Sequence, residues 1–482
     1  MEKKNYIVAI DLGTASVVVA VGTKHADGLV EILSVVSKPS EGVKAGKIEN
    51  IEQVSRAIRS AVEESEQQLG IRISEAYAGI SGDFVRCARH ADHVFVAAEH
   101  QSCVAQSDVD QLFERMNNVQ APDDEVIMEH LPQNYTVDNN HEVENPVGSF
   151  GRKLSATFNF ILCQKTPIDR LNMALKRVGI KMQGALANVL VTPESLLSAD
   201  EKEEGVALVN LGAGVTDITI YHRNVIRYVA SIPMGASAIN RDIRTMSVPE
   251  RHVEPLKLQY GAAVADRVSS DIMIRVNGRT AREATEILLH NLAIVVEARA
   301  TDIAEFVMQE IKDSGYATRL PFGVVLTGGS AKLKDIDELF RRVTGMEVRI
   351  AQPEVGLAEE SKALVADPAY ATVVGLLLKG ASLGISSLIE PYVVTPEPAK
   401  RPSFTPPTPA STPQFKHVPP RVTEPVSEPA PVVEPDGEPD GEPIQDEFAS
   451  EEQPAPSRFG RFIKGAFTKI TETFTAAEDE EI

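Results

Sequence analysis

Two patterns of hydrophobic residues alternate along most of the chain. Tyr6–Asp11 is an apolar run that ends in an acid, which predicts a buried strand, and Val17–Gly22 predicts the returning strand of a hairpin. After this hairpin, apolar residues recur at helical spacing over Ile51–Leu69, which predicts a helix. Strands that alternate with helices predict an α/β fold.

The same hairpin pattern recurs further along the chain. Val206–Leu211 and Thr216–Tyr221 again read as strand, turn and strand, and Phe322–Leu326 predicts another strand that ends at Thr327 and two glycines. This recurrence predicts two similar halves.

The composition changes after residue 388. Residues 389–456 hold more than half of the chain's 30 prolines, many acids and few large apolar side chains. Such a segment cannot bury enough surface to offset its ordering entropy, so we predict a disordered linker there.

The segment 457–475 again has a helical pattern and predicts an amphipathic helix. Its apolar positions span an arc of about 140° at 100° per residue, and its basic residues lie opposite. A face of phenylalanines against a basic face is typical of a helix that lies on a membrane surface. A helix that docks in a partner's groove, or that folds back on the body, is the alternative. The expected membrane-binding residues are Arg458, Phe459, Arg461, Phe462, Ile463, Lys464, Phe467, Lys469, Ile470 and Phe474.

The net charge and the cysteine content exclude several classes of function. The net charge of -21 argues against a nucleic-acid partner and requires that any contact with anionic lipid be local. The three cysteines fit neither a zinc site nor a disulfide framework. Met1–Asn5 leads directly into a strand-like run and no apolar run is long enough to span a bilayer, so we expect a cytoplasmic protein with a peripheral membrane contact.

Three glycine-containing turns are candidates for a phosphate-binding site. In the first, Gly13 permits close approach of phosphates, Thr14 adds a hydroxyl, and Asp11 is suited to hold Mg²⁺ through water. The second turn runs from Asn210 through Gly212, Gly214 and Thr216 to Asp217, and the third contains Gly328, Gly329 and Ser330 before an expected helix. Each turn alone is also compatible with an ordinary structural turn. Their order along the chain resembles the actin, sugar-kinase and chaperone-ATPase superfamily, in which two duplicated halves hold ATP in a central cleft.

Longer segments resemble one family within that superfamily. The chain is similar to FtsA, the actin-like family that tethers the bacterial division ring to the membrane, over roughly residues 5–388. The segments that carry the resemblance are Ala76–Arg86, Ser107–Val109, Asn145–Phe160, Thr166–Glu194 and Val253–Gly261.

The resemblance implies an organisation for the whole chain. It implies a first actin-like lobe over 1–82 and 160–190, an inserted family-specific subdomain over 83–159, and a second lobe over 191–235 and 300–388. A small upper subdomain would occupy 236–299, followed by the linker and the terminal helix.

The resemblance also implies roles for residues. Asp11, Gly13 and Thr14 would contact phosphate and Mg²⁺, and the second turn would contact the phosphates from the other half. Gly328, Gly329 and Ser330 would line the adenine. Glu254 and Lys257 would reach the ribose or adenine, unless they form only a solvated helix face. The implied partners are FtsZ, other copies of the chain in a filament, other division proteins and the anionic inner face of the cell membrane.

One departure bears on catalysis. Asn210 stands where relatives often have aspartate, and an amide lacks the charge that holds Mg²⁺ and polarises an attacking water. No glutamine or glutamate is an obvious water-positioning residue. We therefore expect at most a slow ATPase. The alternative functions are a small-metabolite kinase on the same fold and a pilus-assembly scaffold.

Overall fold

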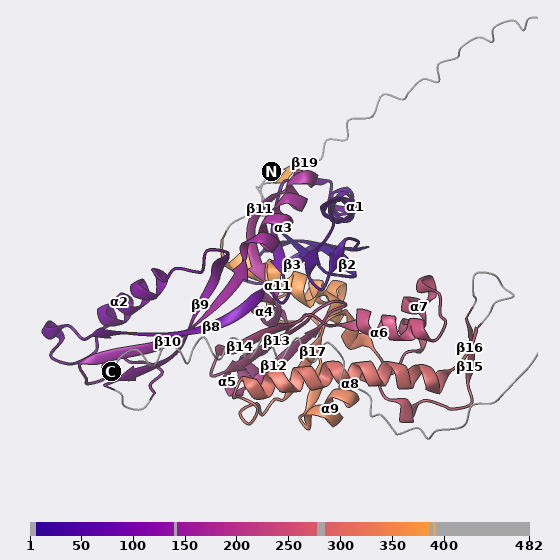
Figure 1. The fold of residues 1–482 in the computed structure, drawn as a ribbon. Coiled ribbons are helices and arrows are strands. Elements are labelled where there is room, and N and C mark those ends of the chain that lie inside the picture. Colours follow the sequence, from indigo (N-terminus) through magenta and orange to yellow (C-terminus); the bar gives the residue numbers. More distant parts are fainter. Residues whose placement is uncertain (1–5, 139–141, 277–284, 385–388, 392–482) are drawn as a thin grey trace, which may run out of the picture. The chain divides into compact units, whose positions relative to one another are not determined.

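The computed structural model describes residues 6–138, 142–276, 285–384 and 389–391 (Figure 1). All of them belong to one compact unit, Met1–Pro398. This unit contains two five-stranded sheets, which form the centres of two lobes, and one three-stranded sheet in an inserted subdomain.

The sheet of the first lobe has the strand order β11-β7-β1-β2-β3. β1 and β2 form the expected hairpin, with Asp11 opposite Val18, and β7 runs parallel to β1. The strands are β1 (Tyr6–Leu12), β2 (Ser16–Lys24), β3 (Val30–Pro39), β7 (Glu75–Ile80) and β11 (Lys181–Ala187).

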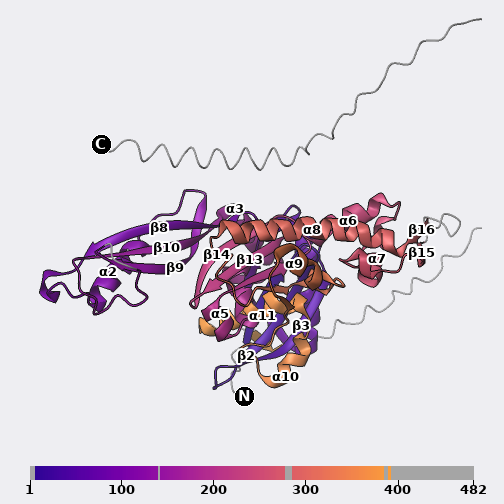
Figure 2. The same ribbon diagram turned by 90° about the horizontal axis from the view of Figure 1, so that it is seen from below.

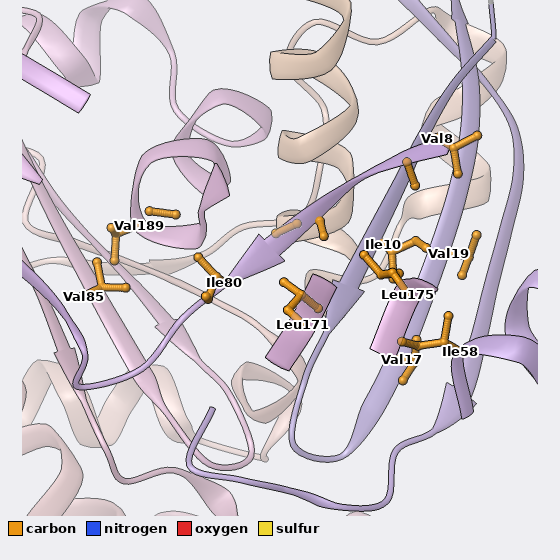
Figure 3. Close-up of a cluster of buried hydrophobic side chains, with 14 of the residues drawn as sticks. Val8, Ile10, Val17, Val19, Ile58, Ile80, Val85, Leu171, Leu175 and Val189 are labelled. Carbon is orange, nitrogen blue, oxygen red and sulfur yellow. The ribbon is translucent and has the colours of Figure 1, made fainter. Parts of the chain in front are cut away.

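Both faces of this sheet are covered by helices. Val8 and Ile10 of β1 pack with Ile58 of α1 (Ile51–Leu69) and Leu175 of α3 (Lys165–Val178), as Figure 3 shows. Ile7 and Ala9 point to the other face and pack with α11 (Ala371–Ser382). The alternation of side chains along a strand therefore explains why β1 is apolar at every position from residue 7 to residue 10.

The sheet of the second lobe has the order β14-β13-β12-β17-β18 and repeats the hairpin-plus-parallel arrangement. The helices α8 (Leu289–Asp313) and α9 (Ile336–Thr344) pack against each other beside it (Figure 2). The strands are β12 (Val206–Leu211), β13 (Thr216–His222), β14 (Val225–Ile232), β17 (Val324–Thr327) and β18 (Val348–Ile350).

The inserted subdomain is a sheet of order β8-β10-β9 with one helix on it. Its elements are β8 (Val85–Phe95), α2 (Gln106–Asn117), β9 (Glu125–Val137) and β10 (Lys153–Gln164). Phe113 of α2 meets Phe158 of β10 edge to face, and Leu112 and Leu154 are fully buried in the same core.

The small subdomain follows β14. Its elements are α6 (Ala236–Thr245), α7 (Glu250–Tyr260), β15 (Met273–Val276), β16 (Thr285–Leu288) and the first turns of α8. Ile243, Val253, Leu292 and Val296 form its core.

The expected linker does not begin at residue 389, because Ile389–Pro391 forms strand β19, antiparallel to β6 (Ile71–Ile73). A proline is tolerated there because it stands at the end of an edge strand. The rest of the expected linker and the expected helix at 457–475 lie outside the described residues. Of the helices in the described ranges, none alone has the length and apolar content needed to cross a bilayer.

Candidate functional site

A cavity of about 860 Å³ opens between the two lobes and the small subdomain. This volume is in the range of small-molecule and cofactor sites. Most of the residues expected from the three turns and from α7 line it: Asp11, Gly13, Thr14, Asn210, Gly212, Gly214, Glu254, Lys257, Gly328, Gly329 and Ser330.

The first turn joins β1 to β2. The N–H of Gly13 donates to the carbonyl of Ser16 (2.9 Å), and a Cβ at Gly13 would lie 3.0 Å from that oxygen. The Thr14 hydroxyl accepts from the N–H of Gly46, which lies in the turn between the two-residue strands β4 (Val43–Lys44) and β5 (Lys47–Ile48). The first turn is thus closed tightly and backed by a second small hairpin.

The second turn, between β12 and β13, lies against the first. A Cβ at Gly214 would overlap the hydroxyl of Thr14, so glycine is required for the two lobes to approach this closely. The N–H groups of Ala236 and Ser237, at the start of α6, donate to the carbonyls of Gly212 and Ala213. The turn is therefore fixed on both sides.

Thr216 is the one residue of the expected set that lies outside the cavity. Its side chain is fully buried, and its hydroxyl donates to the carbonyl of Met234 (2.9 Å). The side chains of β13 alternate, and the turn residue before Thr216 already faces the cavity. Thr216 thus supports the turn from behind and does not face a ligand.

The third turn packs on the second. Gly328 has φ of 88°, and a Cβ there would overlap the side-chain oxygen of Asn210. The Ser330 hydroxyl donates to the carbonyl of Gly212 (3.1 Å). The helix expected directly after the glycines is only a single 3-10 turn, Gly329–Lys332, and α9 begins at Ile336. The expected helix N-terminus is therefore not part of this site.

Two carboxylates face the cavity, that of Asp11, which is half-buried, and that of Asp217, which is buried. The pKa of Asp11 is raised to about 6, mainly by desolvation and also by the nearby charge of Asp217. A hydrogen bond from the Asn188 amide opposes this rise. Burial also raises the pKa of Asp217 to about 6, although the hydroxyls of Ser231 and Ser81 donate to it. Ionising both carboxylates is costly because they are desolvated and repel each other. A cation bound between them would reduce this cost.

Mg²⁺ fits this donor set. It prefers oxygen ligands and usually keeps several waters, with one or two carboxylates and the substrate phosphates. Asp11 and Asp217 supply the carboxylates, and in the described part of the chain no group of three or more Asp, Glu, His or Cys side chains forms a closed metal cage. The side-chain oxygen of Asn188, beside Asp11, is buried without a hydrogen-bond partner.

The small subdomain contributes polar groups to the opposite part of the cavity. The Lys257 ammonium, almost completely buried, donates to the Glu254 carboxylate (2.8 Å), which also accepts from the Asn240 amide (2.6 Å). Lys257 is therefore not on a solvated helix face. Glu254, by contrast, is half exposed.

Sequence reasoning included Asp217 in the second turn without giving it a role, and it missed Ser81, Asn188 and Asn240 as cavity residues. A signal existed for Asp217, because an acid near the start of an expected strand rich in β-branched residues is expected to have a partner when the strand is buried. Ser81 directly follows the parallel strand β7, and ligand-binding groups often lie at the carboxyl ends of parallel strands. Neither motif nor spacing marks Asn188 or Asn240.

Two lobes on similar sheets, with a cavity between them and an inserted subdomain in the first, define an actin-like protein. A solved structure of the "PilM-PilN type IV pilus biogenesis complex" has the same fold, with a TM-score of 0.53 at 13% identity over 78% of this chain and 98% of that chain. The family model "Cell division protein FtsA" matches residues 207–375, and "SHS2 domain inserted in FTSA" matches residues 85–162.

The relatives agree with these family models. The cell division protein FtsA of Pseudomonas aeruginosa is 33% identical over 377 residues, which cover 78% of this chain and 89% of the relative. The FtsA proteins of Escherichia coli K12 and Bacillus subtilis are 29% and 30% identical, with 90% and 84% of the relatives covered. The chain belongs to the FtsA family of cell-division proteins, and the resemblance drawn from the sequence motifs is confirmed.

Proposed function

We propose that this cell-division protein binds ATP with Mg²⁺ in the cavity between its lobes. The observation that carries the proposal is the convergence of three glycine turns from two lobes around two carboxylates whose charge is costly, those of Asp11 and Asp217. Backbone N–H groups at such turns suit phosphate oxygens, and the carboxylates suit the accompanying cation.

Each part of the cavity has a role in this proposal. The turns at Gly13 and Gly214 hold the phosphates between the lobes, and Asp11 and Asp217 hold Mg²⁺ through water. Glu254 and Lys257 bind the ribose or adenine, and the turn Gly328–Ser330 lies along the adenine. Bound Mg²⁺ would neutralise the phosphate charge, and the chain itself orients the nucleotide and excludes water from it.

Binding is better supported than hydrolysis. Asn210 is neutral and its amide donates to Thr372, so it supplies no base. Asp217 already accepts hydrogen bonds from two serine hydroxyls, so fewer of its lone pairs are free to orient an attacking water. We propose a slow ATPase at most, in which ATP acts mainly as a conformational ligand. Steady turnover at about 1 per second or faster by the purified protein would contradict this.

The proposed function also includes assembly of the protein into filaments and attachment of the division ring to the membrane. The protein forms actin-like filaments, recruits FtsZ through the small subdomain at 236–299, and lies on the cytoplasmic face of the inner membrane at the division site. The helix proposed at 457–475 is the membrane contact. Membership of the FtsA family favours this function over a metabolite kinase or a pilus scaffold.

Calorimetric titration of the purified protein with Mg²⁺-ATP tests the central claim. Gly214→Ala places a methyl group against Thr14 and should weaken ATP binding by about tenfold or more, the equivalent of about 1.4 kcal/mol. Gly184→Ala in β11 is the control, since its Cβ would meet Tyr77 only at ordinary contact distance. Failure of the natural protein to bind ATP, or equal affinities for both variants, would refute the proposed site.

A further inference from the structure

Strand β14 joins the candidate nucleotide site to the inserted subdomain. It forms the edge of the second lobe's sheet, and it contacts β8 and β9 of the inserted subdomain. Its pairing with β13 shifts between Ile220 and Tyr221, so that Arg227 is an extra residue with no partner in β13. Side chains of a regular strand alternate between the two faces of the sheet, and a bulge of this kind changes the direction in which one side chain points.

The redirected Arg227 side chain enters the inserted subdomain. It is only 5% exposed, and its guanidinium donates to the Gln133 carbonyl and the Asn134 side-chain oxygen of β9, both at 2.9 Å. It also donates to the carbonyl of His222 in β13. Because all three acceptors are uncharged, the buried cation depends on their geometry for its stability.

Two more hydrogen bonds hold the subdomain to the same strand. The Asn159 amide of β10 donates to the Arg227 carbonyl (3.0 Å), and the Gln133 amide of β9 donates to the Ile226 carbonyl (2.9 Å). The orientation of the inserted sheet is thus tied to the backbone position of Ile226 and Arg227.

The other end of β14 contacts Asp217, which lines the cavity. Ser231 lies directly opposite Asp217 in the ladder, and its hydroxyl donates to the Asp217 carboxylate (2.6 Å). The same carboxylate accepts from Ser81 of the first lobe (2.7 Å). Ser231 and Arg227 are four residues apart, about 13 Å along an extended strand.

We propose that β14 couples nucleotide binding to the orientation of the inserted subdomain, with Ser231 and Arg227 as the positioning residues at its two ends. The inference rests on the proposed function. Binding of Mg²⁺-ATP changes the charge and hydrogen bonds around Asp217, and Ser231 follows the carboxylate. The extended strand carries this shift to the bulge, where Arg227 and its carbonyl hold β9 and β10.

Coupling between two sites is reciprocal. If nucleotide stabilises the contacts of Arg227, then loss of those contacts must weaken nucleotide binding by the same factor. This reciprocity distinguishes coupling from simple destabilisation of the inserted subdomain.

Hydrogen exchange of the full-length protein tests the forward direction. Mg²⁺-ATP should slow exchange in β9, around residues 131–137, by about fivefold or more. Ser231→Ala, measured at saturating ATP, should abolish this response, and Ser382→Ala should keep it because Ser382 lies outside the cavity and its hydroxyl donates to the carbonyl of Lys379 in α11. Demonstrated ATP binding without a response in β9 would overturn the coupling alone, whereas absence of ATP binding would overturn the proposed function as well.

Calorimetry tests the reverse direction. Arg227→Met and the milder Asn134→Ala should each weaken Mg²⁺-ATP binding, the former by about fivefold or more. Arg115→Met is the control, since Arg115 pairs with Asp92 inside the inserted subdomain and does not touch β14. Unchanged ATP affinity in Asn134→Ala and Arg227→Met, with either variant folded, would contradict the proposal.

Discussion

At the scale of single residues, the charge on Asp217 is costly in the ligand-free protein and useful when a cation is bound. Its side chain is 5% exposed, and burial raises its pKa from 3.8 to about 6, so at pH 7 it is ionised at a cost of roughly 1–3 kcal/mol. The hydroxyls of Ser81 and Ser231 compensate only in part. The site therefore holds unfavourable charge until a cation arrives.

Asp217→Asn should accordingly have opposite effects on stability and on binding. The amide oxygen can still accept from a serine, while the charge is gone, so the ligand-free variant should unfold at a higher temperature at pH 7 than the natural protein. The rise in melting temperature on addition of Mg²⁺-ATP should shrink. Thermal unfolding with and without Mg²⁺-ATP measures both. Asp367→Asn is the control, because Asp367 lines the cavity in an exposed ion pair with Lys332. A lower melting temperature without ligand would contradict this account of Asp217.

Gly328 combines a conformational and a steric requirement. Its φ of 88° is unfavourable for other residues, and a Cβ there would overlap Asn210. Gly328→Ala should destabilise the protein by roughly 1–3 kcal/mol and abolish ATP binding. Gly28 has φ of 91° but open space around it, so Gly28→Ala should carry only the conformational cost. Urea unfolding and ATP titration of both variants separate the two costs; equal losses would show that contact with Asn210 is unimportant.

At the scale of elements, Asp108 fixes the start of α2 in the inserted subdomain. Its buried carboxylate accepts from the N–H of Ala105 (2.9 Å) and of Ala97 (3.2 Å), and from the His100 ring (2.9 Å). Burial alone would raise the pKa of Asp108, but these hydrogen bonds outweigh it and the pKa is lowered below 3.8. One side chain thus joins the helix to the segment that follows β8.

Asp108→Ala should therefore lower the free energy of unfolding by roughly 1–3 kcal/mol, because it leaves the partly buried N–H groups of Ala97 and Ala105 without this acceptor. The sign of the pH effect follows from the lowered pKa. The contribution of ionised Asp108 is present above the ordinary pKa of 3.8 and is lost as the pH falls below it. Urea unfolding at pH 7 and at pH 3 should show a smaller difference between variant and natural protein at pH 3. Asp110→Ala on the same helix, where the carboxylate accepts from the exposed Gln106 amide, should be nearly neutral at both pH values.

The elements with strong periodicity were predictable from the sequence. Tyr6–Leu12 and Val206–Leu211 are buried on both faces, so they read as apolar runs, and the helix predicted over Ile51–Leu69 has those bounds in the structure. The helix expected after Gly329 was wrong, because Asp335, with φ of 60°, interrupts the chain between the short 3-10 turn and α9. A single residue in the left-handed region leaves no periodic signal.

At the scale of the whole molecule, glycines in the turns could be recognised in the sequence, but the groups that complete the cavity could not. Ser81 meets Asp217 over 136 residues of chain, and Asn188 meets Asp11 over 177. The Asn188 contact depends on the parallel pairing of β1, β7 and β11, and the Ser81 contact depends on the packing of one lobe on the other; no local pattern determines either. Thr216 illustrates the converse, since it belongs to the motif and faces away from the cavity.

ATP binding in the cavity should strengthen the membrane contact of the proposed helix at 457–475. One short amphipathic helix should bind lipid weakly and reversibly, because ordering entropy offsets much of its apolar and basic contribution. A filament presents many such helices and gains affinity through multivalency. If ATP favours the filament, Mg²⁺-ATP should increase sedimentation of the full-length protein with vesicles that contain anionic lipid.

Three comparisons make this test specific. A chain that ends at Pro456 should not sediment with the vesicles in either condition. Gly328→Ala, expected to lose ATP, should sediment weakly and show no gain from Mg²⁺-ATP, whereas Gly28→Ala should respond as the natural protein does. Negative-stain microscopy on lipid monolayers should show filaments only where ATP is present and can bind. Equal sedimentation of the full-length and shortened chains would refute the membrane helix, while ATP-independent sedimentation of the full-length chain would refute only the link to assembly.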